Sequence, residues 1–401
     1  HRQLFGRAGR LMPDNVPGNA ARVLCRACTG YEQAQVDAAV EAVFAFCQSA
    51  GRLGPYSRVL LKPNLLAKHP PERAVTTHPM VVAACIRACV RRGVLPQNIT
   101  VADSPGGAWT PGGMRAVYEQ SGVAAVCKEA GAALYLGCKA GMRKTQGERV
   151  RSFDLMEPVL DADFIIDIPK VKTHVMVGMT CAVKNLFGTV PGLQKAEFHM
   201  RFPEKESFGD MLVDLCETVK PDLTVVDGVL AMEGDGPASG TPYALGLILG
   251  GPSAYDVDLA VCRIMGISPQ RVPYLAAAVR RGLCAAQAEE GMLCGDVQAA
   301  APRAGFRPPS SMMDLTFAQK APRPIRWLVP GAEKWVAPRP RVRRALCIGC
   351  GKCAGICPGH TIRVRGGKAH ISRAGCIRCF CCHEMCPVKA IEVRRFALFR
   401  R

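Results

Sequence analysis

Long apolar runs are missing from this sequence of 401 residues, although 49% of its residues are hydrophobic. The longest apolar stretch, near residues 244–249, is far shorter than the roughly 20 residues that a membrane-spanning helix needs. A basic segment followed by an apolar one, the pattern of a secretory leader, is also missing. We therefore expect no membrane partner, and the removal of a leader before His1 stays open.

Acidic residues are scarce, with 33 Asp and Glu against 52 Lys and Arg, and the formal net charge is +19. The imbalance is concentrated in residues 338–401, where 15 Lys and Arg face only Glu384 and Glu392. No helix-turn-helix, zinc-finger or RNA-recognition pattern accompanies this charge, so we expect no nucleic-acid partner. Such a region can dock an acidic electron carrier, a ferredoxin or flavodoxin, or can be a solvated basic surface.

A disulfide framework is not indicated either, although the chain contains 21 cysteines. Twelve of them are scattered singly outside the C-terminal region, as at Cys47, Cys85, Cys127 and Cys216. Small secreted proteins place their cysteines much more densely. The scatter indicates reduced thiols in a reducing cytoplasm, as in an anaerobe.

Eight of the other cysteines form two copies of the motif C-x2-C-x2-C-x3-C-P. The first copy contains Cys347, Cys350, Cys353 and Cys357, and the second contains Cys376, Cys379, Cys382 and Cys386. This spacing is that of bacterial ferredoxins with two 4Fe-4S clusters. A pair of zinc sites is the alternative, but zinc sites usually use two separated cysteine pairs.

In such ferredoxins the fourth cysteine of each copy reaches the cluster held by the other copy. We therefore predict two clusters. One is bound by Cys347, Cys350, Cys353 and Cys386, and the other by Cys376, Cys379, Cys382 and Cys357. Cys381 falls outside the pattern, and we expect a spare thiol near a cluster.

Upstream of these motifs, apolar strands alternate with helices. Strands are predicted at 58–62, 99–103, 163–168, 222–227 and 244–249, and helices at 36–47, 79–92, 178–187 and 256–265. The alternation predicts an α/β fold, a mostly parallel sheet covered by helices, followed by a small α+β ferredoxin domain. We expect an arm at 1–20, an α/β domain at 21–307, a Pro- and Arg-rich linker at 308–341 and the ferredoxin-type domain at 342–401.

Polar residues gather where the predicted strands end, which is where open α/β sheets bind their ligands. Lys172, His174 and Lys184, with Asp103 across a cleft, form the predicted catalytic site. Lysines attract a carboxylate or phosphate, and histidine or aspartate can move a proton. A single histidine is more often structural, so the prediction of a small anionic ligand depends on the convergence of these groups.

Six motifs in this region are together similar to the domain of unknown function 362 family. They are LLKPNLL at 60–66, TTHP at 76–79, DSPGG at 103–107, PKVKTH at 169–174, KNLFG at 184–188 and MEGDGP at 232–237. The resemblance spans roughly residues 20–290, and many family members end in a ferredoxin module. The resemblance implies an iron–sulfur cluster-binding protein but does not indicate a substrate.

A fainter likeness concerns the order Lys184, Pro191-Gly192, His199. It is similar to lactate racemases with a nickel-pincer cofactor, where the lysine tethers the cofactor and the histidine helps to hold nickel. The spacing differs here, and the earlier double-histidine pattern is not evident. The likeness is an analogy only.

Together these observations predict an iron–sulfur electron-transfer protein, namely a ferredoxin-linked oxidoreductase whose α/β body binds a small anionic substrate. Two alternatives stay open: an electron carrier or scaffold without a substrate, and non-redox isomerase or racemase-like chemistry in the body. No Rossmann, flavin or haem fingerprint identifies a second redox cofactor.

Overall fold

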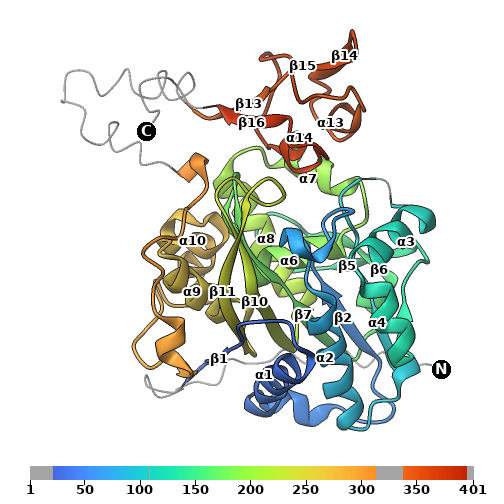
Figure 1. Cartoon of the computed structure of the whole chain (residues 1–401), viewed down its shortest axis with the longest axis vertical. Coiled ribbons are helices and arrows are strands. Elements are labelled where there is room, and N and C mark those ends of the chain that lie inside the picture. Colours follow the sequence, from blue (N-terminus) through green and yellow to red (C-terminus); the bar gives the residue numbers. More distant parts are fainter. Residues whose placement is uncertain (1–20, 108, 313–336, 395–401) are drawn as a thin grey trace.

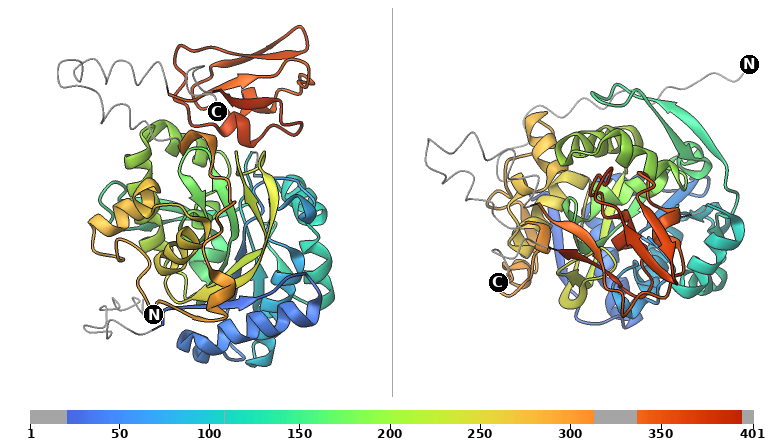
Figure 2. Two further views of the ribbon diagram at one scale, coloured as in Figure 1. Left: turned by 60° about the vertical axis from the view of Figure 1, so that its left-hand side comes forward. Right: turned by 90° about the horizontal axis from the view of Figure 1, so that it is seen from above.

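The computed structural model describes residues 21–107, 109–312 and 337–394 (Figure 1). The predicted arm and most of the predicted linker lie outside these ranges. Residues 21–312 form an α/β body, and residues 337–394 form a small unit that we call the cluster domain. Figures 1 and 2 show the cluster domain seated on one end of the body.

The body is built around one ten-stranded sheet. Its main path runs β12 (Leu293–Gly295), β1 (Val23–Ala27), β11 (Thr241–Gly251), β10 (Leu223–Glu233), β7 (Phe164–Ile168), β2 (Val59–Pro63), β3 (Ile99–Val101) and β4 (Ala133–Leu134). The strands from β10 to β4 are parallel, whereas β11 is antiparallel to both β10 and β1. The predicted mostly parallel sheet is therefore confirmed.

Helices cover both faces of this sheet, as Figure 2 shows. One apolar core lies under α1 (Gln33–Phe46), α2 (Pro79–Arg91), α3 (Pro111–Gln120) and α4 (Val123–Ala130). The other lies under α8 (Lys205–Val219), α9 (Ala254–Met265) and α10 (Pro273–Arg280). Central parallel strands are buried on both faces, which explains why they are continuously apolar in the sequence.

Helix ends follow local signals in the sequence. Pro79 opens α2 because the first helical position needs no N–H donor, and Nδ1 of His78 accepts the Met80 N–H. Ser253 caps α9 by accepting the Asp256 N–H. The helices α1, α2 and α9 consequently begin and end within a few residues of the predicted bounds.

The helix predicted at 178–187 is wrong over its first half. Residues Gly178–Thr180 form β9, which pairs with β8 (Lys170–His174), and only the single turn α6 (Ala182–Asn185) is helical, before a 3-10 turn at Leu186–Thr189. Pairing with β8 prevails over the local helical pattern. The carboxylate of Asp258 then accepts the N–H groups of Ala182 and Val183 and fixes the start of α6.

Smaller elements complete the body. The hairpin of β5 (Ala140–Lys144) and β6 (Ser152–Met156) precedes α5 (Glu157–Asp161), and α7 (Gln194–Arg201) follows the 3-10 turn. In the described part of the chain, no helix is both long and apolar enough to cross a bilayer.

The cluster domain consists of two similar halves. Strands β13 (Arg339–Val342) and β16 (Ile391–Arg394) pair, as do β14 (Ile362–Arg365) and β15 (Lys368–Ile371). One helical turn belongs to each half, α13 (Lys352–Gly355) and α14 (Cys381–Glu384). This arrangement agrees with the small α+β unit expected from the repeated cysteine motif. Strand β13 begins within the segment that the sequence assigns to the linker.

Candidate functional site

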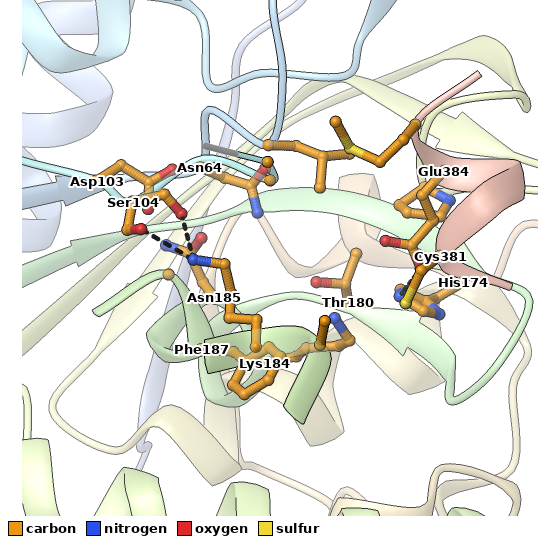
Figure 3. A pocket seen from close by; sticks show the side chains of 18 of the residues that line it. Asn64, Asp103, Ser104, His174, Thr180, Lys184, Asn185, Phe187, Cys381 and Glu384 are labelled. Atoms are coloured by element: carbon orange, nitrogen blue, oxygen red, sulfur yellow. Dashed lines mark hydrogen bonds and ion pairs between the residues drawn. The ribbon is translucent and has the colours of Figure 1, made fainter. Parts of the chain in front are cut away.

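A cavity lies between the body and the cluster domain, beside the ends of β2 and β3. Its empty volume is about 760 Å³, and residues of both parts line it. Figure 3 shows Asp103 and Ser104 on one side and His174, Cys381 and Glu384 on the opposite side. We call this space the interdomain cavity. The structure brings all four predicted catalytic residues into its wall: Asp103, Lys172, His174 and Lys184.

Four lysines approach the cavity from separate elements. Lys62 comes from β2, Lys172 from β8, Lys184 from α6 and Lys195 from α7. Opposite charges attract more strongly where little water remains to screen them. The arrangement therefore favours an anion in the interdomain cavity.

Lys62 and Asp103 form an ion pair within the cavity wall. Nζ of Lys62 lies 2.7 Å from Oδ1 of Asp103, and the two side chains are 1% and 4% exposed. Oδ2 of Asp103 accepts the Leu65 N–H at 2.8 Å. A Cβ at Gly188 would collide with Oδ1 of Asp103, so only glycine leaves room for the pair. Both oxygens of Asp103 are thus engaged by the protein.

Lys172 is held by two acceptors. Its Nζ donates to Oδ1 of Asn64 at 2.8 Å and to the Val75 carbonyl at 2.7 Å. Burial, with the nearby charge of Lys184, lowers the pKa of Lys172 to about 7. Two acceptors match the two hydrogens of a neutral amine, whose lone pair can then accept a proton. Lys172 is consequently suited to gain or lose a proton near neutral pH.

Lys184 has no hydrogen bond or ion pair with any described residue. Its Nζ lies 5.6 Å from the ring centroid of Phe187, a cation–π contact. Burial lowers the pKa of Lys184, although the carboxylate of Glu384 opposes this effect. An ammonium group with unused donors is ready to bind an anion.

His174 faces Glu384 of the cluster domain, with Nε2 and Oε1 3.1 Å apart. Nδ1 of His174 accepts the Met176 N–H at 3.1 Å, so in the neutral ring the proton is on Nε2. Burial lowers the pKa of His174 to about 4. Burial would raise the pKa of Glu384, but His174, Lys184 and His199 lower it to about 2. A neutral histidine therefore faces an ionised carboxylate.

Two further polar groups of α7 reach the cavity. Nζ of Lys195 donates to the carbonyl and hydroxyl of Ser104 at 2.9 Å and to the Val190 carbonyl at 2.8 Å. Its burial lowers the pKa to about 7, whereas three acceptors match the three hydrogens of an ammonium. His199 stacks on Phe208, and burial lowers its pKa to about 3.

Sequence reasoning missed the residues that the cluster domain and α7 contribute. Lys195 was not singled out, Glu384 was noted only as an acidic residue, and Cys381 only as a spare thiol. Glu384 and Cys381 belong to a domain that is remote in sequence from the body, so no local pattern indicates their place. The order of Lys184 and His199 was noted, and both line the interdomain cavity.

Two smaller cavities lie inside the cluster domain, and each has an empty volume of about 330 Å³. The cysteines of the first are Cys347, Cys350, Cys353 and Cys386. Those of the second are Cys357, Cys376, Cys379 and Cys382. These are the two sets of four that the spacing assigns to two clusters. The number of clusters and their ligands stay predictions.

The surroundings of these thiols fit an iron–sulfur cluster. Backbone N–H groups point at the sulfurs: Ala369 to Cys347 at 3.4 Å and Ala390 to Cys386 at 3.1 Å. Such hydrogen bonds stabilise thiolate ligands and tune the cluster potential. Cys381 is 5% exposed, lines the interdomain cavity and shares a hydrogen bond with the thiol of Cys379.

Direct contacts hold the cluster domain on the body. Nε2 of His383 lies 3.1 Å from the Asp235 carbonyl oxygen, and Lys389 donates to the Gly240 carbonyl at 3.1 Å. A Cβ at Gly106 would lie 2.8 Å from Sδ of Met385, so the absence of a side chain there permits close approach. The interdomain cavity is closed by these contacts on the side of the cluster domain.

Comparisons with known proteins match the body and the cluster domain to two separate families. The family described as Domain of unknown function (DUF362) matches residues 59–263, and the 4Fe-4S binding domain matches residues 340–363. The Thylakoid-associated protein sll1697 of Synechocystis sp. (strain ATCC 27184 / PCC 6803 / Kazusa) is 36% identical over 236 residues, which are 59% of this chain and 71% of that protein.

A solved structure, the lactate racemase apoprotein from Thermoanaerobacterium thermosaccharolyticum, aligns with a TM-score of 0.39 and 10% sequence identity. The alignment covers 63% of this chain and 59% of the racemase chain, which is less than two thirds of its length. The resemblance inferred from the sequence motifs is confirmed by the family match. This chain belongs to the DUF362 family and is an iron–sulfur protein with a 4Fe-4S binding domain at its C-terminal end.

Proposed function

We propose that this protein is an oxidoreductase that transfers electrons between two 4Fe-4S clusters and a small anionic substrate in the interdomain cavity. One observation carries the proposal: the same cavity is lined by Lys184 of the body and by Cys381 and Glu384 of the cluster domain. A molecule bound there touches a cation of the body and a thiol beside a predicted cluster ligand.

Electron transfer is supported by the position of Cys381. The clusters supply or accept electrons one at a time when bound. Cys381 lies in sequence between the predicted ligands Cys379 and Cys382, and its thiol contacts that of Cys379. A substrate in the interdomain cavity would therefore lie next to the predicted cluster that includes Cys379.

The body residues divide the remaining tasks. Lys184 binds the anion, and the Lys62–Asp103 pair fixes the loop that forms one wall. Lys172 gains or loses the proton that accompanies a pair of electrons. His174 stays neutral and orients the carboxylate of Glu384.

The location of the reaction is also a proposal. None of the 21 cysteines forms a disulfide, as expected in a reducing cytoplasm. An electron carrier without a substrate is the main competing function, and it differs by leaving the interdomain cavity without a specific ligand.

Replacement of Lys184 tests the anion site. Lys184→Ala should weaken the binding of an anion in the cavity about tenfold or more, because one charge-assisted hydrogen bond is worth roughly 1.5–3 kcal/mol. Isothermal titration of inorganic phosphate and malonate into the anaerobic protein measures this change. Lys128→Ala, on the exposed surface of α4, is the matched control. Equal affinities in the wild type and Lys184→Ala would contradict the proposed site.

The pH dependence of malonate binding tests Lys172, because malonate, unlike phosphate, does not itself titrate near pH 7. Its pKa of about 7 means that it is charged at pH 6 and mostly neutral at pH 8, so anion affinity should fall as the pH rises through 7. His174 and His199, with pKa values of about 4 and about 3, do not titrate in this range. Lys172→Arg keeps its charge and should flatten the profile. An unchanged slope in Lys172→Arg would assign the effect to another group, such as Lys195.

A further inference from the structure

An exposed surface of the cluster domain, around the hairpin of β14 and β15, lies apart from the interdomain cavity. It is an open hollow with an empty volume of about 1120 Å³. Figure 1 shows this hairpin at the end of the molecule that points away from the body. The four basic side chains that line it are those of His360, Arg363, Arg365 and His370, all exposed.

Strand register places the basic groups on one face of the hairpin. Arg363 lies opposite His370, and Arg365 lies opposite Lys368. Side chains alternate between faces along a strand. The hairpin face with positive charge therefore consists of Arg363, Arg365, Lys368 and His370. The other face carries the apolar residues Ile362, Val364, Ala369 and Ile371.

Acidic residues do not neutralise this face. Residues 337–394 contain 12 Lys and Arg but only Glu384 and Glu392 as acids. Glu384 points at His174 in the interdomain cavity, and Glu392 lies 3.9 Å from Arg343. Within the described cluster domain, the hairpin therefore presents positive charge without a local counter-charge.

The hollow adjoins one of the cysteine cavities. The residues Gly359, Thr361, Ile371 and Gly375 line both spaces. The Thr361 N–H lies 3.4 Å from the sulfur of Cys357, and its hydroxyl oxygen lies 3.3 Å from that sulfur. A molecule in the hollow is thus separated from a predicted cluster ligand by a single layer of residues.

We propose that this hollow is the docking site of a small acidic electron-carrier protein and the place where electrons enter the protein. The proposal rests on the proposed electron-transfer function and adds the partner and the side from which it binds. In each transfer the reduced carrier loses one electron and the cluster domain gains it, with no bond made or broken. The route then continues from the Cys357 side to Cys379 and Cys381 at the interdomain cavity.

A protein fits this surface better than a small anion does. The hollow is open and its arginines are solvated, so a single small anion would gain little from any one of them. A folded partner with several carboxylates would meet all the basic groups at once, and complementary charge accelerates such encounters. Acidic flavodoxin is a suitable probe of this kind.

The test compares flavodoxin with dithionite, which needs no docking surface. Arg363→Glu/Arg365→Glu should weaken the binding of oxidised flavodoxin, measured by isothermal titration, about tenfold or more at low salt. It should slow cluster reduction by reduced flavodoxin similarly in stopped-flow absorbance. High salt should reduce the wild-type rate in the same way, because it screens surface charge. Reduction by dithionite should be unaffected.

A matched variant controls for total charge. Lys128→Glu/Arg263→Glu changes the net charge equally, on exposed helix positions of the body, and should leave flavodoxin binding within about twofold. Unchanged binding in the hairpin variant, or an equal loss in the body variant, would overturn the docking site. A wild type that holds no iron and is reduced by neither flavodoxin nor dithionite would instead refute the proposed function itself.

Discussion

Anaerobically purified protein should contain about eight iron and eight inorganic sulfide atoms per chain, the content of two 4Fe-4S clusters. Cys350→Ala and Cys379→Ala should each lower this content by about half. Each removes one ligand from a different cavity of four cysteines, and a cluster that loses a ligand is easily lost. Iron and sulfide assays, with the visible absorption of the clusters, measure the effect.

Cys381→Ala is the informative control for this experiment. Cys381 is buried beside Cys379 but is absent from both cysteine cavities, so its removal should leave the iron content unchanged. An iron content of about two or four in the wild type, or stoichiometric zinc, would contradict the assignment of two clusters. A loss of half the iron in Cys381→Ala would show that the ligand set is wrong.

The second large effect concerns the buried pair of Lys62 and Asp103. Lys62→Met should lower the free energy of unfolding by about 3–5 kcal/mol, because it leaves an uncompensated buried carboxylate. The Asp103 side chain is 4% exposed, and its Oδ1 lies 2.7 Å from Nζ of Lys62. Urea unfolding of the anaerobic protein, followed by far-UV circular dichroism, measures the change.

Two variants separate the pair from general effects of the substitution. Lys68→Met, at an exposed position nearby, should change stability by no more than about 0.5 kcal/mol. Lys62→Met/Asp103→Asn should recover part of the loss, because no buried charge is then left alone. A cost below about 1 kcal/mol for Lys62→Met would show that the pair is not buried in solution.

Much of the fold follows from local sequence patterns. The strands near residues 59, 99, 164 and 223 are short apolar runs, and each is bounded by Pro, Asn or Asp. The cysteine spacing also predicted which thiols share a cavity, since the register of a repeated motif fixes a repeated fold. Lys172 and His174 are two residues apart in β8, and side chains two residues apart in a strand point to the same face. Their shared orientation therefore follows from the sequence once β8 is identified as a strand.

Other features depend on contacts between distant segments. Strand β9 exists because β8 provides a partner, and no pattern within residues 178–180 indicates it. Glu384 looks like an ordinary surface acid, yet the docking of the cluster domain places it beside His174. Lys195 gains two of its three acceptors, the carbonyl and hydroxyl of Ser104, only when α7 packs on the loop that contains Ser104. The interdomain cavity is therefore a tertiary feature.

Native mass spectrometry of the anaerobic protein, before and after exposure to a metabolite extract, tests the central claim most directly. The account predicts one small anionic molecule bound per chain in the wild type and its loss in Lys184→Ala, with the clusters retained in both. Of the four described lysines that line the cavity, Lys184 is the one whose ammonium no side-chain oxygen engages, so its removal should affect the ligand and not the fold. A wild type that binds no small anion, or a ligand that stays bound in Lys184→Ala, would contradict the account.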